Sequence, residues 1–178
     1  SKKQIVVSRS FGQRISNLKE LRPIVSNFAV RAAEKLRNER QKCSQVSVFV
    51  RTSPFNRNKP QHSDLKTIEL FTPTNDTRDI LTAAKRGLLP IFKSGYDYAK
   101  AGIILNKFSD EKTKQYSLFK DPNEPKQNMR LMKYLDQMNN YETQIYYASQ
   151  NTKKWSPMKQ NMTSPKYTTN WYELPKVN

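Results

Sequence analysis

Residues 45–54 read QVSVFVRTSP, and this stretch decides the fold. Its three valines alternate with Ser47, Phe49 and Arg51 over the length of one strand, so one face is apolar and the other is mixed. A strand of this kind buries its valines under helices and offers its second face to a partner. The stretch therefore predicts a sheet that is covered on one side only.

The charge of the chain is strongly positive and unevenly distributed. The 178 residues include 32 Lys+Arg and 15 Asp+Glu, which gives a formal net charge of +17 and a pI near 10.0. Residues 1–106 hold 20 cationic and 8 acidic side chains, a net of +12, whereas 107–178 hold 12 and 7, a net of +5. A compact domain at +12 repels itself, and a polyanion relieves that repulsion. We therefore expect a nucleic acid as the partner.

Composition limits the class of protein further. Hydrophobic residues make up 35% of the chain, which predicts a modest core and a weakly packed remainder. No apolar run approaches ~20 residues, so no membrane span is expected. The single Cys43 excludes an internal disulfide and is compatible with a reducing cytoplasm. No signal peptide is recognisable, and a strand-like segment follows Ser1 at once, so we expect a piece of a longer protein.

Periodicity predicts the elements before the valine strand. Residues 3–11 read as a strand with a cationic, hydroxyl-rich end, and Gly12 is expected to turn the chain out of it. Apolar residues then recur every three or four positions over 17–40, which indicates a long helix. Pro23 conflicts with an unbroken helix, so either a short initial turn precedes the main helix or the helix kinks.

The elements after the valine strand complete the pattern. Residues 66–72 resume the strand pattern and form a long hairpin with a basic tip. Asp76 or Thr77 then caps a second amphipathic helix, and 96–108 supply a last strand. The order β-α-β-β-α-β predicts an α+β domain, a four-stranded antiparallel sheet with both helices on one face.

The second face of that sheet is left bare and is the candidate binding surface. Cations and hydroxyls suited to phosphate oxygens lie along its strands, although strand phase decides which of them point outward. The candidate DNA-binding residues are Ser8, Arg9, Ser10, Arg51, Thr52, Ser53, Lys66, Thr67 and Lys100. An ordinary solvated sheet face is the alternative, and composition does not separate DNA from RNA.

Beyond the sheet, a short peptide interrupts a charged linker. Residues 115–119 read QYSLF, in which Gln115 is a polar anchor and Leu118 and Phe119 are two large apolar side chains. On an extended segment this arrangement suits docking into a preformed cleft. The alternative is a minor contact with the surface of the chain's own domain.

The chain divides into three predicted parts. Residues 1–110 form the sheet domain, 111–126 the linker, and 127–178 a small C-terminal segment. In the last part, five apolar residues over 129–138 predict a helix, and 145–147 a short strand or second helix. The tryptophans and tyrosines that follow lie among polar residues, which predicts order only on binding, or loose docking on the first domain.

Signs of catalysis are missing from the sequence. His62 has no second His or Cys ligand nearby, so we expect a solvent-facing side chain and no metal site. The acidic pairs at 76 and 79 and at 110 and 111 read as helix-start and linker charges, and there is no Gly-rich phosphate loop. The sequence predicts a chain without catalysis and without a cofactor of its own.

Six short stretches together carry a resemblance to a known family. The chain resembles the C-terminal region of UmuC-type proteins, the catalytic subunits of bacterial DNA polymerase V and members of the Y family of translesion polymerases. The stretches are SRSFG at 8–12, RAAEKLR at 31–37, TSPF at 52–55, TPT at 72–74, KAG at 100–102 and SPKYTT at 164–169. The resemblance implies that the first part is a little finger, a β-α-β-β-α-β module that lies along the major groove and grips the template-primer backbone.

The resemblance also implies partners. It places a motif for the β sliding clamp at 115–119, with Tyr116 where the usual pattern favours Leu, and it likens the segment from Met129 onward to a small domain of this polymerase class. Processed UmuD and RecA are implied partners, and the bacterial cytoplasm and its nucleoid the implied location. Mg²⁺ is implied only for palm carboxylates, which this chain lacks. We expect a non-catalytic DNA-binding and clamp-docking fragment active in damage bypass.

Two other functions stay open. A stand-alone RNA-binding module would also use a basic sheet face, but such modules display aromatic side chains for base stacking, and Phe49 is the only clear candidate on the central strand. A protein-interaction adaptor would use the basic surface to meet acidic partners.

Overall fold

A computed structural model describes residues 2–56, 58–112, 124–139, 145–150, 164–165 and 167–174. The elements are, in order, β1 (Ile5–Ile15), α1 (Leu18–Asn38), β2 (Gln41–Thr52), β3 (Ser63–Thr74), α2 (Thr77–Ile91), β4 (Tyr98–Asp110), α3 (Glu124–Asn139) and the single-turn 3₁₀ helix η1 (Trp171–Glu173).

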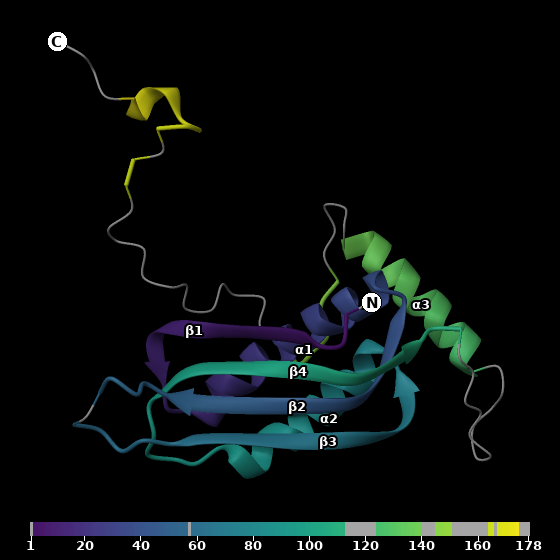
Figure 1. The fold of residues 1–178 in the computed structure, drawn as a ribbon, viewed down its shortest axis with the longest axis horizontal. Helices are drawn as coiled ribbons and strands as arrows, with labels where there is room; N and C mark the ends of the chain where they lie inside the picture. The colour runs from purple at the N-terminus through teal and green to yellow at the C-terminus, as the bar shows by residue number, and fades with distance from the viewer. Residues whose placement is uncertain are drawn as a thin grey trace.

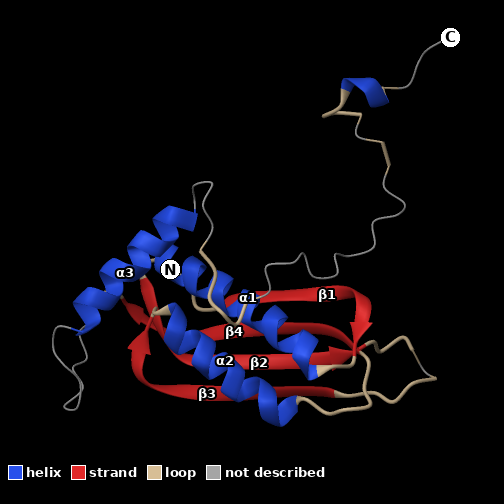
Figure 2. Cartoon of the chain, turned by 180° about the vertical axis from the view of Figure 1, so that it is seen from behind, coloured by secondary structure: helices blue, strands red, loops and turns tan. Residues whose placement is uncertain are grey.

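The four strands form one antiparallel sheet in the order β1-β4-β2-β3. Figure 1 looks onto its open face, and Figure 2 shows α1 and α2 lying across the other face. The outer strand β1 pairs with β4, so the first and the last strand of the sheet in sequence are neighbours. The predicted α+β architecture is confirmed.

The core lies between the sheet and the two helices. The three valines of β2 are fully buried there, as their alternation predicted. Cys43 lies in the same layer, and burial raises the pKa of its thiol to about 12, which leaves it protonated and unreactive at neutral pH. The residues of α1 that face this core recur at steps of three and four: Leu21, Val25, Phe28, Ala32 and Leu36.

The helix α1 differs from the prediction at its start. It is one helix from Leu18 onward, with Pro23 inside it, so of the two alternatives the separate initial turn is wrong. Asn17 caps the helix, and its side-chain oxygen accepts a hydrogen bond from the Lys19 amide at 2.8 Å. A proline at the sixth helical position removes one backbone hydrogen bond, a loss that burial of the apolar stripe offsets.

The strand β1 runs further than predicted. Gly12 does not end it, because the strand continues to Ile15. Its register with β4 shifts between Ser10 and Ile15, and Figure 1 shows the strand bending sharply at this end. Phe11 and Ile15 are both buried, in phase with Ile5 and Val7 on the helix side of the sheet.

The second helix follows its predicted signals at the N-terminus. Asp76 is the N-cap, and its carboxylate accepts a hydrogen bond from the Arg78 amide at 2.8 Å. The helix ends at Ile91, and Gly95 supplies a left-handed residue, with φ of +84°, in the turn before β4.

The C-terminal part is partly described. The predicted helix after the linker is present as α3, and its Met132 is 1% exposed. Residues 145–147 form neither a strand nor a helix, so that prediction is wrong. None of the described helices is both long and apolar enough to span a bilayer.

Candidate nucleic-acid interface

Side chains on the open face fall into rows, because antiparallel pairing places registered residues on the same side of the sheet. At the end nearest the β2–β3 hairpin, one row consists of Ser10, Lys100, Arg51 and Ser63, one residue from each strand. We call these four residues the basic row. Lys100 is half-buried and the other three are exposed. No carboxylate of the described residues lies within ion-pair distance of Arg51 or Lys100.

Apolar residues occupy the middle of the open face. The ring of Phe49 lies against Gly102, where an added Cβ would be 2.6 Å from Phe49 Cε1 and 2.4 Å from Ser8 Cβ. Leu65 pairs with Phe49 on the edge strand and is 50% exposed, and Val6 on the opposite edge is 47% exposed. The absence of a side chain at Gly102 therefore allows the Phe49 ring to lie flat on the sheet, since any larger residue would push the ring outward.

The far end of the open face is polar and charge-balanced. Gln4 donates to Asn106 at 2.9 Å, and Gln45 donates to Glu69 at 2.8 Å. Lys107 forms an ion pair with Glu69 at 2.9 Å. The hydrogen bonds from Lys107 and then Gln45 hold the pKa of Glu69 below its usual value. A cation at this end thus has a carboxylate partner.

The register divides the nine predicted DNA-binding residues between the two faces. Lys66 pairs with the buried Val48, and Thr52 is itself buried, so both belong to the helix side of the sheet. Arg9 pairs with the buried Ala101, in the same phase, at the exposed outer edge. Those in phase with the open face are Ser8, Ser10, Arg51, Thr67 and Lys100; Ser53 follows β2 in the hairpin loop.

The hydroxyls of the predicted set are engaged to different degrees. Thr67 shares a 2.8 Å hydrogen bond with Ser47 across the open face. Thr52 donates to Gln61 Oε1 at 2.8 Å and accepts from the His62 amide at 3.0 Å, so it closes the base of the hairpin. Thr52 therefore has a structural role in place of the predicted binding role on the sheet face.

The β2–β3 hairpin loop contains residues that the sequence reasoning did not select. Phe55 in this loop is 92% exposed. His62 was expected to face solvent, but it is half-buried: its Nε2 lies 3.0 Å from Ile91 O, and its ring centroid is 5.0 Å from that of Tyr96. An aromatic residue among Asn, Lys and Gln in a turn-rich loop was the signal available for Phe55.

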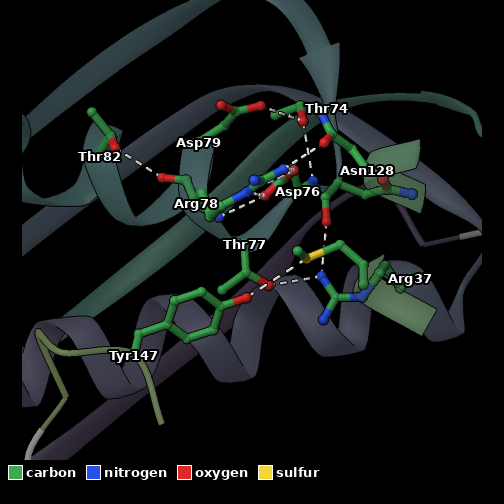
Figure 3. Close-up of polar contacts among 11 residues, drawn as sticks. Arg37, Thr74, Asp76, Thr77, Arg78, Asp79, Thr82, Asn128 and Tyr147 are labelled. Carbon is green, nitrogen blue, oxygen red and sulfur yellow. Dashed lines mark hydrogen bonds and ion pairs between the residues drawn. The ribbon is translucent and has the colours of Figure 1, made fainter. Parts of the chain in front are cut away.

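The opposite end of the domain is closed by buried polar contacts, shown in part in Figure 3. The guanidinium of Arg37 binds both carboxylate oxygens of Asp136 at 2.6 Å, and it donates to Asn75 O and Thr77 Oγ1 at 2.8 and 2.9 Å. Its side chain is only 10% exposed. The bidentate pair thus ties α3 to the C-terminal end of α1, and the other two hydrogen bonds tie α1 to the start of α2.

Further contacts strengthen the same junction. Arg78 Nη2 donates to Asn128 Oδ1 at 2.7 Å, and the hydroxyl of Tyr147 lies 3.7 Å from Met132 Sδ. Burial raises the pKa of Tyr147, consistent with its position against the domain (Figure 3). α3 and Tyr147 therefore make specific polar and apolar contacts with the domain, while order on binding or loose docking of the aromatic residues that follow stays a prediction.

Two family profiles match consecutive parts of the chain. Residues 2–118 match a family described as the impB/mucB/samB family C-terminal domain, and 129–177 match one described as Domain of unknown function (DUF4113). The chain belongs to the impB/mucB/samB family. The resemblance to the C-terminal region of UmuC-type proteins is confirmed, while the predicted domain boundaries at 110 and 126 stay predictions.

Named relatives of the impB/mucB/samB family align along almost the whole chain. Protein UmuC of Salmonella typhimurium is 42% identical over 180 residues, which cover 99% of this chain and 42% of that protein. Protein SamB of the same organism is 42% identical over 175 residues, and Protein MucB of Escherichia coli is 43% identical over 176 residues. Each alignment covers 98% of this chain and 41% of the relative, so the chain spans less than half the length of these relatives.

A solved structure is also similar. It is titled "Complex of beta-clamp processivity factor and little finger domain of PolIV", and it covers 66% of this chain and 99% of its own. The TM-score is 0.45 and the sequence identity is 12%, values too low to bear on the function of this family member.

One predicted feature of this impB/mucB/samB family member falls outside the described residues. The peptide with Gln115, Leu118 and Phe119 lies outside them. The preceding residue Glu111 is held in place, since its amide donates to Arg40 O at 3.1 Å. Within the described ranges, no three His, Cys, Asp or Glu side chains come together.

Proposed function

We propose that this chain is the part of an error-prone translesion DNA polymerase that grips the template-primer duplex and docks on the β sliding clamp. The supporting observation is the basic row, which aligns two cations and two hydroxyls across a sheet face without a helix over it. Phosphate oxygens accept hydrogen bonds from such groups, and these contacts carry no base information. The duplex is therefore held at its backbone, whatever its sequence.

Electrostatics support duplex DNA as the ligand of this face. Some cations of the domain have carboxylate partners, such as Lys107 with Glu69 and Lys59 with Asp97. Arg51 and Lys100 have none in the described ranges, so their fields extend into solvent. Release of condensed counterions on phosphate neutralisation then supplies the binding free energy.

The proposed protein partners are the sliding clamp, which the peptide at 115–119 would bind, and the partners implied by the family. Leu118 and Phe119 enter an apolar cleft of the sliding clamp, and Gln115 hydrogen-bonds at its edge. Nucleotide transfer, with its carboxylates and Mg²⁺, belongs to the portion of the relatives that this chain does not span. Processed UmuD and RecA are partners of the whole polymerase.

The test compares cations on the two faces. Arg51→Ala with Lys100→Ala should flatten the log-log salt dependence of duplex binding by about 1.8, since each phosphate contact contributes roughly 0.9. Lys66→Ala, with its side chain on the helix side of the sheet, is the matched control and should change the slope little. Fluorescence anisotropy against salt concentration measures both.

Three results would contradict this function. Equal slopes for the double variant and the wild type would remove the basic row from the interface. Tighter binding of single-stranded RNA than of duplex DNA would favour the RNA-binding module. Clamp binding without any duplex binding would favour the protein-interaction adaptor.

A further inference from the structure

The β2–β3 hairpin projects beyond the end of the sheet that carries the basic row (Figure 1). In its loop, three residues after β2 ends, Phe55 is 92% exposed. Single exposed apolar residues are common on protein surfaces and need no explanation by themselves. Two further observations, the order of the loop and its cationic setting, distinguish Phe55 from such a residue.

Hydrogen bonds within the hairpin fix the backbone on both sides of Phe55. At the base, the Thr52 amide donates to His62 O at 2.9 Å, and the His62 amide returns a bond to Thr52 Oγ1. Across the loop, Gln61 Nε2 donates to Asn56 O at 2.7 Å. The Asn56 amide donates in turn to Ser53 O at 3.3 Å, so the turn around Phe55 is closed.

Contacts with neighbouring elements hold the hairpin in place. His62 lies 3.0 Å from Ile91 O at the C-terminal end of α2 and stacks obliquely with Tyr96. Lys59 forms an ion pair with Asp97 in the segment before β4. A side chain presented on a loop that is already ordered loses little conformational entropy on binding. The exposed ring is therefore pre-organised for a contact.

The surroundings of the loop indicate the chemistry of that contact. A small hollow beside the hairpin is lined by Arg14, by Lys59 and by Asp97, the ion-pair partner of Lys59. Arg14 and Arg51 of the basic row are thus the cations next to the hairpin without a carboxylate partner in the described ranges. Aromatic side chains next to a cationic track are the combination that holds single-stranded nucleic acid, because every base offers a π-face. Duplex DNA offers such faces only where its pairing ends.

We propose that Phe55 stacks on an unpaired base of the DNA strand that continues beyond the duplex held by the basic row. This inference rests on the proposed duplex binding and extends it to the junction between paired and unpaired DNA. The basic row holds phosphates of the duplex, and the hairpin reaches past its end to the first exposed base.

The experiment uses the 178-residue chain and two DNA probes, a blunt duplex and the same duplex with a short single-stranded extension. Wild type should bind the extended probe more tightly. Phe55→Ala should lose roughly tenfold in affinity for the extended probe, the usual cost of removing one base-stacking ring. Its affinity for the blunt duplex should stay the same.

Matched variants separate stacking from other effects. Phe71 is 85% exposed but lies on β3 near the charge-balanced end of the sheet, so Phe71→Ala removes an equal ring and should leave both affinities unchanged. Phe55→Trp should keep the preference for the extended probe. Phe55→Leu keeps an apolar side chain without a flat ring and should behave as the alanine variant does.

Three outcomes would overturn the inference: wild-type affinity of Phe55→Ala for the extended probe, an equal loss on both probes, or an equal loss in Phe71→Ala. Failure of the proposed function looks different. In that case the wild type would not bind the blunt duplex even at low salt, whatever residue occupies position 55.

Discussion

Two arginines at opposite ends of the sheet have opposite surroundings. At the hairpin end, Arg51 is exposed and has no carboxylate partner within the described ranges. At the other end, Arg37 is nearly buried and bound by Asp136, and Lys107 is bound by Glu69. Arg37 thus closes its end of the domain, and under the proposed function Arg51 is available to phosphate at the other end. Net charge alone, +17 for the chain, does not reveal this division.

The contrast also separates two partners in space. The open end offers unpaired charge to a polyanion, whereas the closed end anchors α3 and the start of the linker, which leaves β4 after Asp110. Changes at one end should therefore leave the activity of the other intact. Each prediction below tests whether a change at one end leaves the other end unaffected.

The largest expected effect is at the closed end. Asp136→Ala removes the partner of a nearly buried guanidinium, so docking of α3 should weaken by about 3 kcal/mol, the lower part of the range for breaking buried pairs, because Asp136 is itself 25% exposed. Hydrogen exchange of the α3 amides measures it, with the exposed neighbour Gln137→Ala as control. Duplex affinity should not change, and a large fall in it would show that the two ends are coupled.

The next effect concerns the linker peptide. Leu118→Ala with Phe119→Ala should weaken clamp binding by roughly a hundredfold or more, because each large side chain contributes about 1.5 to 3 kcal/mol when buried. The change alters no charge, so affinity for duplex DNA and its salt slope should stay constant. Titration against clamp and duplex in parallel decides the matter. Unchanged clamp affinity would reject the peptide, and a loss in both affinities would place it in the packing of the domain.

A smaller effect is expected between the two ends. Gly102→Ala places a Cβ 2.4 Å from Ser8 Cβ and 2.6 Å from the Phe49 ring, so the free energy of unfolding should fall by about 1 to 3 kcal/mol through overpacking. Denaturant unfolding measures the loss. Adding Ser8→Gly removes the closest contact and should restore part of the stability. A neutral Gly102→Ala would mean that Phe49 swings outward at little cost.

The smallest effect is at the exposed Glu69. Hydrogen bonds from Lys107 and Gln45 depress its pKa in the folded state, so its contribution to stability is present above the unfolded pKa and disappears as pH falls through the folded pKa. Thermal melts from neutral to acid pH should therefore show a slightly shallower acid loss for Glu69→Gln than for wild type. An identical acid limb would show that the pair contributes nothing in solution, as is common for exposed pairs.

The sequence predicted what depends on local pattern. The alternating valines of β2, the apolar stripe of α1 and the cap at Asp76 each follow from neighbours in the chain. Which cations share a face depends on register, and the phase of Lys66 against Thr67 is known only once β3 is paired with β2. The partnership of Arg37 with Asp136 joins residues 99 positions apart and leaves no local signal.

The periodicity of the sequence also did not predict two irregularities of the backbone. Glycine is typical of the end of a strand, yet β1 continues past Gly12, with a shift of register after Ser10. Pro23 disfavours a helix interior, yet tertiary burial of the neighbouring Ile24 and Val25 holds α1 continuous across it. In both cases packing against the sheet outweighed a local preference that sequence reasoning could only rank.

The pairing of β1 with β4 has a consequence for how the chain is made. Ile5 is registered with Leu105, so the strand of the sheet that is synthesised first lies beside the strand that is synthesised last. At about 5 to 20 residues per second, β1 waits on the order of 5 to 20 seconds for that partner. Contacts this distant in sequence form late and slow the folding of a domain. Until β4 emerges, the apolar face of β1 depends on α1 alone for cover, and synthesis past Asp110 is the step that completes the sheet.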